Sequence, residues 1–550
     1  MKRFLFVAVL ILSQIPVVSI FAQGEYQKIK QYDTCIDVLE YQLEINLLNN
    51  FKSAESRSFN GYEKITLIIV SLPDSGKIWL HASSKSLKIN KVEGQLDLIA
   101  QIGDRVYLKI PGEVKTGDTL TAGIYYSHNG SKDEAFYVSK GSVFTNNSPV
   151  EARDWFISKD HPIDKAVFSL KLLVPSDVKV GAVGLLEGEY DSLGGKVFHW
   201  KSNIPMATYL MVFSASNEYR IENFNTVSKL TGRTIPVELY WRNGESYDAV
   251  TYIGQVIPYM LDFFESRFGE YPFEKIAFAT LTPDFPYGGM ENQSFITLCS
   301  GCWYELLVVH EFAHQWFGDL ITPSTWSDLW LNEGFAEFME AYWVEVWAPD
   351  GKKAYREVVE EFASYYFTME PKEAIFEESW EYNTPPGGIL YNSALVYKKA
   401  ACVVYMLREE TGDENFFKIL KQFTTNSEFK FANASTNDLV NLTNEITGKK
   451  YNWFFDQWIK HPGHPVYKNS YDFIEEDGKD YLVYTFTQKE SDRLYYQSTV
   501  ELKVIYKDGT SEIFKCFNSK NGEKFNFEVK PNVKSVIFDP ENKIVLKEVK

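Results

Sequence analysis

The sequence is poor in cysteine, in histidine and in basic charge. Its 550 residues include only 5 Cys, and so sparse and odd a set excludes a fold that depends on a disulfide framework. Acidic residues outnumber Lys and Arg by 74 to 56, so no excess of cations is available for the phosphates of nucleic acid. We therefore expect no nucleic-acid partner, and any histidine-based metal site must draw on 8 His residues.

Long apolar runs are also scarce, and the clearest one lies at the N-terminus. Residues 1–22 begin with a basic pair, continue as FLFVAVLILSQIPVVSIFA and give way to a polar, charged stretch. This pattern is typical of a secretory signal peptide, with cleavage expected after Ala22. No later segment reaches the length of a membrane span, so we expect no transmembrane anchor after signal cleavage. The mature protein is then exported, and is periplasmic or secreted.

The periodicity of apolar residues divides the rest of the sequence into three parts. Short alternating runs such as KITLIIV and FSLKLLV, separated by Gly, Asn and Asp turns, predict an all-β region first. The apolar spacing then changes to a helical period, and strand-like runs return near the C-terminus as a small β-sandwich. We predict a multidomain α+β chain with a signal peptide (1–22), an N-terminal β domain (23–235), a mostly helical domain (236–462) and a C-terminal β-sandwich (463–550).

A HEFAH motif at residues 310–314 carries the strongest chemical signal. Residues four apart share one face of an α-helix, so His310 and His314 can bind one zinc ion together. Glu311 lies beside them and can take a proton from a water that the metal activates. Tetrahedral zinc needs a third protein ligand and an open fourth position, and Glu333 in LNEGFAE is the candidate ligand. The motif predicts zinc-assisted hydrolysis, against the alternative of two unrelated His on a surface or core helix.

The segment around the motif predicts a buried helix. WYELLVVHEFAHQWFG is apolar over most of its circumference and ends at Gly318, a residue suited to a helix stop. Two imidazoles and a carboxylate on such a helix need partners, because an unpaired buried polar group costs about 1 to 3 kcal/mol. One zinc ion would satisfy all three.

Glu333 is expected on a second helix, which begins within WSDLWLNEGFAE. Ser327 or Asp328 is the expected N-cap of that helix. Glu337 and Glu340 follow Glu333 on the same face, so one of them can orient a zinc-binding imidazole, unless both face water.

A third helix is expected from about Asn392 to Thr411, behind a TPPGG loop. Tyr391 and Tyr397 flank its start. Since six residues turn an ideal helix by about 240°, at most one of the two should point at a given site.

Cys299 and Cys302 form a CSGC motif just before the zinc helix. No partner pair occurs elsewhere in the sequence, so we expect an inert or locally bridged pair rather than a second metal site or a redox centre.

Three motifs occur in order along the chain: PDFPYGGMEN at 283–292, HEFAH with Glu333, and YKKAACVVYML from Tyr397. Together they resemble the aminopeptidase N family of zinc metallopeptidases, a gluzincin family that also includes the leukotriene epoxide hydrolase. The segments at 152–168 and 453–465 look like that family's N-terminal domain and its exit from the catalytic domain. The resemblance implies a saddle-like N-terminal β domain, a thermolysin-like catalytic domain and a C-terminal β-sandwich. The chain resembles the short members of the family, which lack the helical C-terminal domain of the long members.

The resemblance implies an aminopeptidase that uses one zinc ion and acts on peptides with a free N-terminus. The family's GxMEN glutamate, which pairs with the substrate's α-amino group, corresponds to Glu291. A fixed carboxylate near zinc selects the first peptide bond from the N-terminus for cleavage, because it pairs with the substrate's α-ammonium. A buried ammonium without a counter-charge is costly. Gly288 and Gly289 would let the substrate backbone approach, although a plain β-turn also explains them. Tyr397 would donate a hydrogen bond to the oxyanion of the tetrahedral intermediate, with Tyr391 as the alternative.

The sequence departs from the family pattern where the substrate's amine should be held. The family commonly has TQxEPxDAR, whereas this chain has TNNSPVEAR, so the glutamine is Asn146 and the nearby acidic position is Ser148. We call the residues that bind the substrate's α-amino group the amine clasp. We expect this clasp to be weaker here, with Glu291 providing most of the binding of the amine. The full set of implied substrate-binding residues is Gly288, Gly289, Met290, Glu291, Asn292 and Asn146.

Other functions stay open from the sequence alone. An endopeptidase of the thermolysin kind is favoured by an open cleft and by the altered amine clasp, and an epoxide hydrolase could use the same zinc and glutamates. A peptide-binding or adhesion protein without catalytic activity is the alternative from another class. The intact HEFAH motif, Glu333 and Tyr397 disfavour that last alternative.

Overall fold

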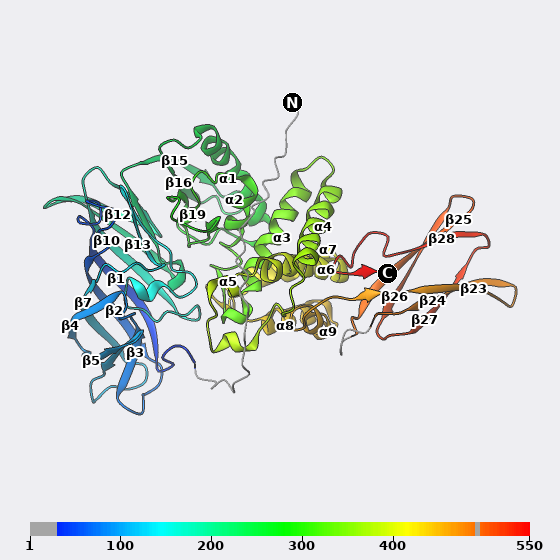
Figure 1. Ribbon diagram of the computed structural model, residues 1–550, viewed down its shortest axis with the longest axis horizontal. Coiled ribbons are helices and arrows are strands. Elements are labelled where there is room, and N and C mark those ends of the chain that lie inside the picture. The colour runs from blue at the N-terminus through cyan, green and yellow to red at the C-terminus, as the bar shows by residue number, and fades with distance from the viewer. Residues whose placement is uncertain (1–29, 490–494) are drawn as a thin grey trace.

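The computed structural model describes residues 30–489 and 495–550, which form three parts arranged in a row (Figure 1). A β-rich part comes first, a mostly helical part lies in the centre, and a second β part follows. The α+β fold class predicted from periodicity is therefore confirmed. The predicted signal peptide lies outside the described residues, and within those residues no helix is both long and apolar enough to cross a bilayer.

The first part is built on a seven-stranded sheet with the order β12-β13-β10-β1-β2-β7-β4. β1 and β10 pair in parallel, and the other neighbours pair antiparallel. In β1, buried Tyr41, Leu43 and Ile45 alternate with more exposed residues, as expected for a sheet with one covered face. The strands of this sheet are β1 (Ile36–Asn46), β2 (Phe59–Ile69), β4 (Leu87–Gly94), β7 (Thr119–His128), β10 (Lys165–Val174), β12 (Leu185–Ser192) and β13 (Gly195–Ala207).

Two smaller sheets complete the first part. Their orders are β3-β6-β5 and β11-β14-β9-β8. The strands are β3 (Lys77–His81), β5 (Asp97–Ile102), β6 (Arg105–Lys109), β8 (Phe136–Ser139), β9 (Ser142–Thr145), β11 (Lys179–Ala182) and β14 (Phe213–Ser216). The chain that leaves β9 reaches the central part, where the Ser148 hydroxyl is hydrogen-bonded to the Tyr391 hydroxyl. This link brings the loop with Asn146 beside the central part.

The central part begins with a five-stranded sheet of the order β15-β16-β17-β19-β18. β15 and β16 form an antiparallel hairpin, so the boundary that the sequence predicted at residue 236 falls inside β16. Its strands are β15 (Tyr219–Val227), β16 (Thr234–Arg242), β17 (Ile276–Thr280), β18 (Gly289–Met290) and β19 (Ile296–Leu298). The short edge strand β18 carries part of the GGMEN motif.

Helices make up the rest of the central part, and α3 lies at their centre. α3 packs against α2, α4 and α6, which explains why apolar residues occur around its whole circumference. The helices are α1 (Tyr247–Phe268), α2 (Glu305–Ala313), α3 (Trp330–Trp347), α4 (Gly351–Met369), α5 (Gly387–Leu390), α6 (Ala400–Thr411), α7 (Asp413–Thr425), α8 (Thr436–Thr447) and α9 (Asn452–Trp458). A short parallel pair, β20 (Ile321–Pro323) and β21 (Ala432–Ala434), joins two of the connecting loops.

The predicted end of the zinc helix is wrong. α2 ends at Ala313, five residues before Gly318, and the chain then turns. The His314 ring nitrogen Nδ1 bonds the Phe317 carbonyl oxygen at 3.1 Å, and this contact requires the backbone to leave the helix.

The predicted N-cap of the second helix is also wrong. Ser327 and Asp328 lie in a 3-10 turn, η3 (Trp326–Asp328), and Leu329 occupies the N-cap position of α3. The Ser327 hydroxyl donates to the Glu377 carbonyl at 2.7 Å, and Asp328 accepts from the Thr436 backbone at 2.8 Å. Both side chains therefore bind other segments instead of capping α3.

The third helix has an irregular start. Residues Ser393–Lys399 form a π-helical segment, η5, and the regular helix α6 follows it directly. π-Helical segments widen the turn and occur often at functional sites.

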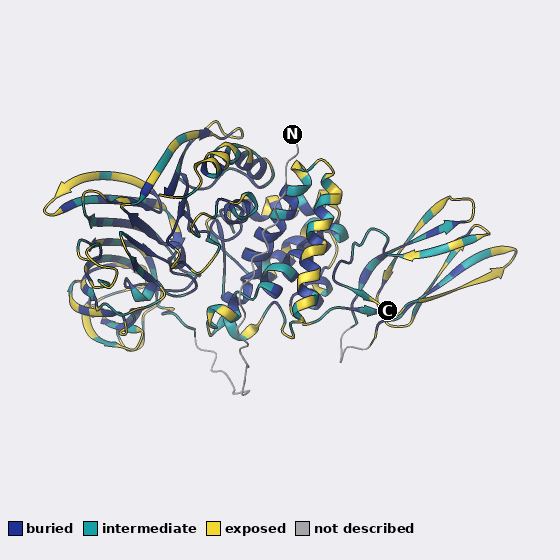
Figure 2. Cartoon of the chain, turned by 45° about the horizontal axis from the view of Figure 1, so that its top comes forward, coloured by how far each residue is buried: buried dark blue, intermediate teal, exposed yellow. Residues whose placement is uncertain are grey.

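The last part is a small sandwich of two three-stranded sheets, β23-β24-β27 and β26-β25-β28. Some of its buried residues belong to the main core, and four others form a separate small cluster. Figure 2 shows that intermediate and exposed residues dominate this last part, whereas buried residues gather in the central helices. The strands are β23 (Ser470–Glu476), β24 (Lys479–Phe486), β25 (Ser498–Tyr506), β26 (Ser511–Asn518), β27 (Glu523–Val529) and β28 (Val533–Phe538), and β22 (Val466–Tyr467) pairs with β29 (Glu548–Val549).

Candidate active site

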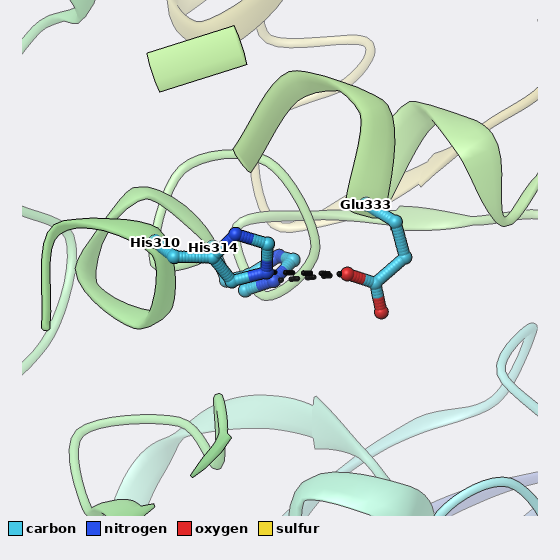
Figure 3. Close-up of side chains that lie close together, drawn as sticks. All are labelled: His310, His314 and Glu333. Atoms are coloured by element: carbon cyan, nitrogen blue, oxygen red, sulfur yellow. Dashed lines mark ion pairs between the residues drawn. The ribbon is translucent and has the colours of Figure 1, made fainter. Parts of the chain in front are cut away.

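Two neighbouring helices bring His310, His314 and Glu333 together. α2 and the turn after it present the two His rings, whose centroids lie 4.8 Å apart. α3 presents Glu333 opposite them, as Figure 3 shows. The Nε2 atoms of His310 and His314 each lie 3.4 Å from Oε2 of Glu333. The structure therefore places all three predicted metal ligands around one point.

The donor set fits a zinc ion in both chemistry and spacing. Ligand atoms at about 2.0 to 2.1 Å from a tetrahedral zinc lie roughly 3.3 to 3.4 Å from one another, which agrees with the measured separations. All three side chains are buried, and Oε2 of Glu333 has no well-formed hydrogen bond among the described residues, only the two imidazole nitrogens at 3.4 Å. A buried carboxylate oxygen held this loosely is costly unless a cation binds there.

Hydrogen bonds at the Nδ1 atoms orient the two imidazoles. Oε1 of Glu340 lies 2.9 Å from Nδ1 of His310, as expected for one of the two downstream glutamates. Glu337 instead pairs with Lys398. His314 has two acceptors at its Nδ1, and both rings are left with Nε2 directed at the metal position. Such contacts fix the tautomer of a metal-binding His.

Glu311 is buried next to the ligand set. Burial raises the pKa of its carboxyl to about 8, although the nearby His310 and His314 oppose the rise. A divalent cation in the site would lower this pKa, because its charge favours the carboxylate. β18 lies directly against Glu311: a Cβ added to Gly289 would approach the Glu311 carboxyl carbon to 2.5 Å. The Glu311 side chain is thus packed between α2 and the GGMEN strand.

Glu291 lies on the same side of the site. A carboxylate oxygen of Glu291, a carboxylate oxygen of Glu311 and a ring nitrogen of His314 all lie within 4.8 Å of one another. Burial raises the pKa of the Glu291 carboxyl, and the His314 charge opposes this. The Gln315 side chain donates to the Glu291 backbone carbonyl at 3.0 Å, so the turn after α2 also anchors the loop that carries Glu291.

Both candidate tyrosines lie near these carboxylates. The rings of Tyr397 and His310 are nearly parallel, with centroids 6.1 Å apart. Burial raises the pKa of Tyr397 and of Tyr391, and the negative charges of Glu291 and Glu333 add to the rise in both cases. The ideal-helix geometry behind the expectation that at most one tyrosine faces the site does not occur here. Tyr391 precedes the helix, and the π-helical turn between the two breaks the 240° relation of an ideal helix.

The remaining predicted substrate-binding residues have different surroundings. Asn292 donates to the Thr297 hydroxyl at 2.9 Å and so holds its own loop. Met290 is buried in β18, and Gly288 accepts from the Cys299 backbone at 2.8 Å. Asn146 is 3% exposed, and its Oδ1 has no partner in the part of the chain that the structure describes. Its unpaired oxygen is suited to accept a hydrogen bond from a bound ligand.

Two residues that hold the site together were not anticipated. Asn332 contacts both His314 and Glu291, at 3.1 and 2.9 Å. Gln315 joins the Glu291 loop to the turn after α2. Each is a sequence neighbour of a predicted ligand, and a polar amide within an otherwise apolar segment was the available signal.

The CSGC motif forms a disulfide between Cys299 and Cys302, in agreement with the locally bridged alternative. Glu245 fastens this loop by accepting from the Gly301 backbone at 2.8 Å and the Trp303 indole at 3.1 Å. The loop leads directly into α2, so it supports the start of the helix that carries the His pair.

Two family models match the chain. The peptidase M1 N-terminal domain matches residues 32–210, and the peptidase family M1 domain matches residues 254–458. Together these matches cover well over half of the sequence, and the second contains the HEFAH motif and Glu333.

Individual relatives agree with these matches. The chain is 26% identical over 450 residues to a leucyl aminopeptidase of Saccharolobus solfataricus, across 76% of this chain and 53% of that protein. It is 28% identical over 386 residues to aminopeptidase N of Lactococcus lactis subsp. lactis, across 66% of this chain and 43% of that protein. The chain thus spans about half the length of the curated relatives it matches.

A solved structure shares the fold. The M1 zinc metallopeptidase from Deinococcus radiodurans superposes with a TM-score of 0.66 at 21% sequence identity, covering 78% of this chain and 94% of that chain.

Proposed function

The chain belongs to the peptidase M1 family, and from that premise we propose that it is a zinc-dependent aminopeptidase, which releases N-terminal residues from peptides. His310, His314 and Glu333 would hold the zinc ion. When bound, zinc supplies a Lewis acid that polarises the scissile carbonyl and makes a water molecule more acidic. The remaining chemistry belongs to side chains of this chain.

One observation carries the choice of an aminopeptidase. A carboxylate oxygen of Glu291 lies within 4.8 Å of a carboxylate oxygen of Glu311 and of a ring nitrogen of the metal ligand His314. A carboxylate buried that close to the reacting bond attracts an ammonium group, and the backbone of an internal peptide segment has none to offer. A substrate with a free N-terminus can therefore place its first peptide bond at the metal while its α-ammonium pairs with Glu291.

Glu311 and Tyr397 are assigned the chemical steps. The Glu311 carboxylate takes a proton from the attacking water and passes it to the leaving amine. The Tyr397 hydroxyl, which lies beside the His310 ring, donates a hydrogen bond to the oxyanion of the tetrahedral intermediate. Gly289 leaves room for the Glu311 carboxylate against β18, because a glycine has no side chain to displace it.

Asn146 is the second acceptor that we assign to the substrate's α-ammonium, beside Glu291. Asn146 has a buried, unpaired Oδ1, whereas the Ser148 hydroxyl is hydrogen-bonded to the Tyr391 hydroxyl. We assign Asn146 to the α-ammonium and leave Ser148 as a link between the first two parts of the chain. Recognition then rests on one charge and one neutral oxygen, and Glu291 dominates it.

Paired substrates test this function. We expect a fluorophore to be released from aminoacyl substrates, and no release from the same substrates after N-acetylation. Glu291→Ala should remove the preference for a free amine, and Glu311→Ala serves as the blank. Cleavage of N-blocked peptides at internal bonds would instead indicate an endopeptidase.

We also propose that the protein is exported and cleaved after Ala22. The basic start and apolar run of residues 1–22 support this proposal. Expression of the full chain in a bacterial host, followed by mass spectrometry of the N-terminus, tests it. A mature protein that begins at Gln23 in the periplasm or medium is expected, and an uncut cytoplasmic chain would contradict it.

A further inference from the structure

Asn332 connects the metal ligands to the proposed amine site through a single side chain. It immediately precedes Glu333 on α3 and is 1% exposed. Its Oδ1 lies 3.1 Å from Nδ1 of His314, and its Nδ2 donates to Oε1 of Glu291 at 2.9 Å. The ring nitrogen needs an acceptor and the carboxylate needs a donor, so only one orientation of the amide serves both groups.

One of the two groups that Asn332 contacts has a second hydrogen-bond partner, and the other has no second side-chain donor among the described residues. His314 has a second acceptor at its Nδ1, the Phe317 carbonyl oxygen at 3.1 Å, so its tautomer is held twice. For Glu291, Asn332 is the one side chain that donates to the carboxylate within the part of the chain that the structure describes. The orientation of Glu291 therefore depends on Asn332 more than the orientation of His314 does.

The surrounding backbone makes room for this amide. Gly318 has a φ of +142°, and a Cβ added there would approach Cγ of Asn332 to 2.9 Å. A side chain at residue 318 would thus displace the amide from the position between His314 and Glu291. Glycine at that turn is explained by both its backbone conformation and this close approach.

We propose that Asn332 is a positioning residue that aims the Glu291 carboxylate at the substrate's α-ammonium and couples that carboxylate to the metal ligand His314. The inference rests on the proposed role of Glu291. Without the Asn332 donor the carboxylate is free to rotate away, and the site loses selectivity for a free amine before it loses the metal.

Asn332→Asp separates the two contacts with little change in size. The new carboxylate can still accept from His314, but it no longer donates to Glu291 and repels it. We expect the zinc-to-protein ratio to stay at that of the wild type, the KM for aminoacyl substrates to rise about 10 to 100-fold, and kcat to change by less than about fivefold. Asn433→Asp is the matched control, because the Asn433 amide donates to the carbonyls of Pro162 and Pro323 away from the site.

A binding measurement tests the inference without turnover. L-leucinol offers a free amine and no bond to hydrolyse, and N-acetyl-L-leucinol lacks the charge. Calorimetric titration should show that Asn332→Asp weakens L-leucinol binding about 10 to 100-fold and leaves the acetylated compound unaffected. If the wild type binds L-leucinol but hydrolyses nothing, the proposed activity fails while this inference still stands on its binding data. Asn332→Ser, which withdraws the amide without adding a charge, replaces the Asp variant if that variant does not fold.

A double-mutant cycle with Glu291→Gln distinguishes positioning from a general structural effect. If Asn332 acts through Glu291, the double variant should bind L-leucinol no more weakly than Glu291→Gln alone. Additive losses, unchanged L-leucinol affinity in Asn332→Asp, or parallel loss of zinc in that variant would overturn the inference.

Discussion

Gly289 is the position where a single added methyl group tests the geometry of the site most sharply. A Cβ there would lie 2.5 Å from the Glu311 carboxyl carbon and 2.8 Å from its Cγ, whereas ordinary contacts begin near 3.4 Å. Gly289→Ala must therefore push the Glu311 carboxylate back by about 1 Å. The backbone of Gly289 is extended within β18, so the substitution adds no conformational strain of its own.

The expected loss follows from the role proposed for Glu311. A positioned general base contributes about 10²- to 10⁴-fold, and a misplacement of about 1 Å can cost about 10²-fold. We expect kcat for an aminoacyl fluorophore to fall by about 100-fold or more in Gly289→Ala, which corresponds to about 2.7 kcal/mol. Zinc content should not change, because the clash involves none of the three ligands.

Gly288 supplies the matched control for this experiment. A Cβ at Gly288 would meet only Cδ1 of Leu307 at 3.6 Å, an ordinary contact, so Gly288→Ala should keep kcat within about threefold of the wild type. Steady-state kinetics on both variants, with metal analysis and melting temperatures, gives the comparison. Equal activity of the two variants would refute the placement of Glu311 against β18.

Three further predictions concern metal binding and stability. Glu340→Ala removes the partner of His310 and should weaken zinc binding about 10 to 100-fold, as measured by competition with a chelator. Lys399→Met should stabilise the protein, because burial lowers the pKa of Lys399 from 10.5 to about 7. The cost of the buried amine, up to about 5 kcal/mol, is fully present below pH 7 and fades as pH rises to about 10.5, so denaturant unfolding should show the largest gain at or below pH 7. Replacing Cys299 and Cys302 by Ser should lower the free energy of unfolding by about 2 kcal/mol, since the bridge closes only a short loop.

The metal ligands could be predicted from the sequence because their arrangement is mostly local. His310 and His314 are four residues apart, and helical periodicity alone places both imidazoles on one face. Glu333 needed one further assumption, that a second helix packs against the first, and its apolar pattern supported that assumption. The order of β-rich and helical parts followed from the same periodicities.

Features that depend on distant segments could not be predicted in this way. Ser327 and Asp328 have the chemistry of N-caps, but Glu377 and Thr436 are better placed partners for them. The helical-wheel argument about Tyr391 does not apply, because it assumed a regular helix through residues that form a π-helical turn. Local patterns contain neither kind of information.

The double contact of Asn332 shows the same limit within the site itself. Its neighbour Glu333 was recognised because ligand spacing is a sequence property. The role of Asn332 depends on the distance between α3 and the loop with Glu291, 41 residues earlier in the chain. Such bridging amides become visible only once the elements are placed in space.

The most direct test of the central proposal compares one peptide with a free N-terminus and the same peptide with an acetylated N-terminus. The purified protein, with its zinc content measured, is incubated with each peptide, and the products are followed by mass spectrometry. The proposed function predicts one zinc per chain, stepwise release of N-terminal residues from the free peptide, and no cleavage of the acetylated one. Equal cleavage of both peptides, or stoichiometric zinc with no release from the free peptide, would contradict it.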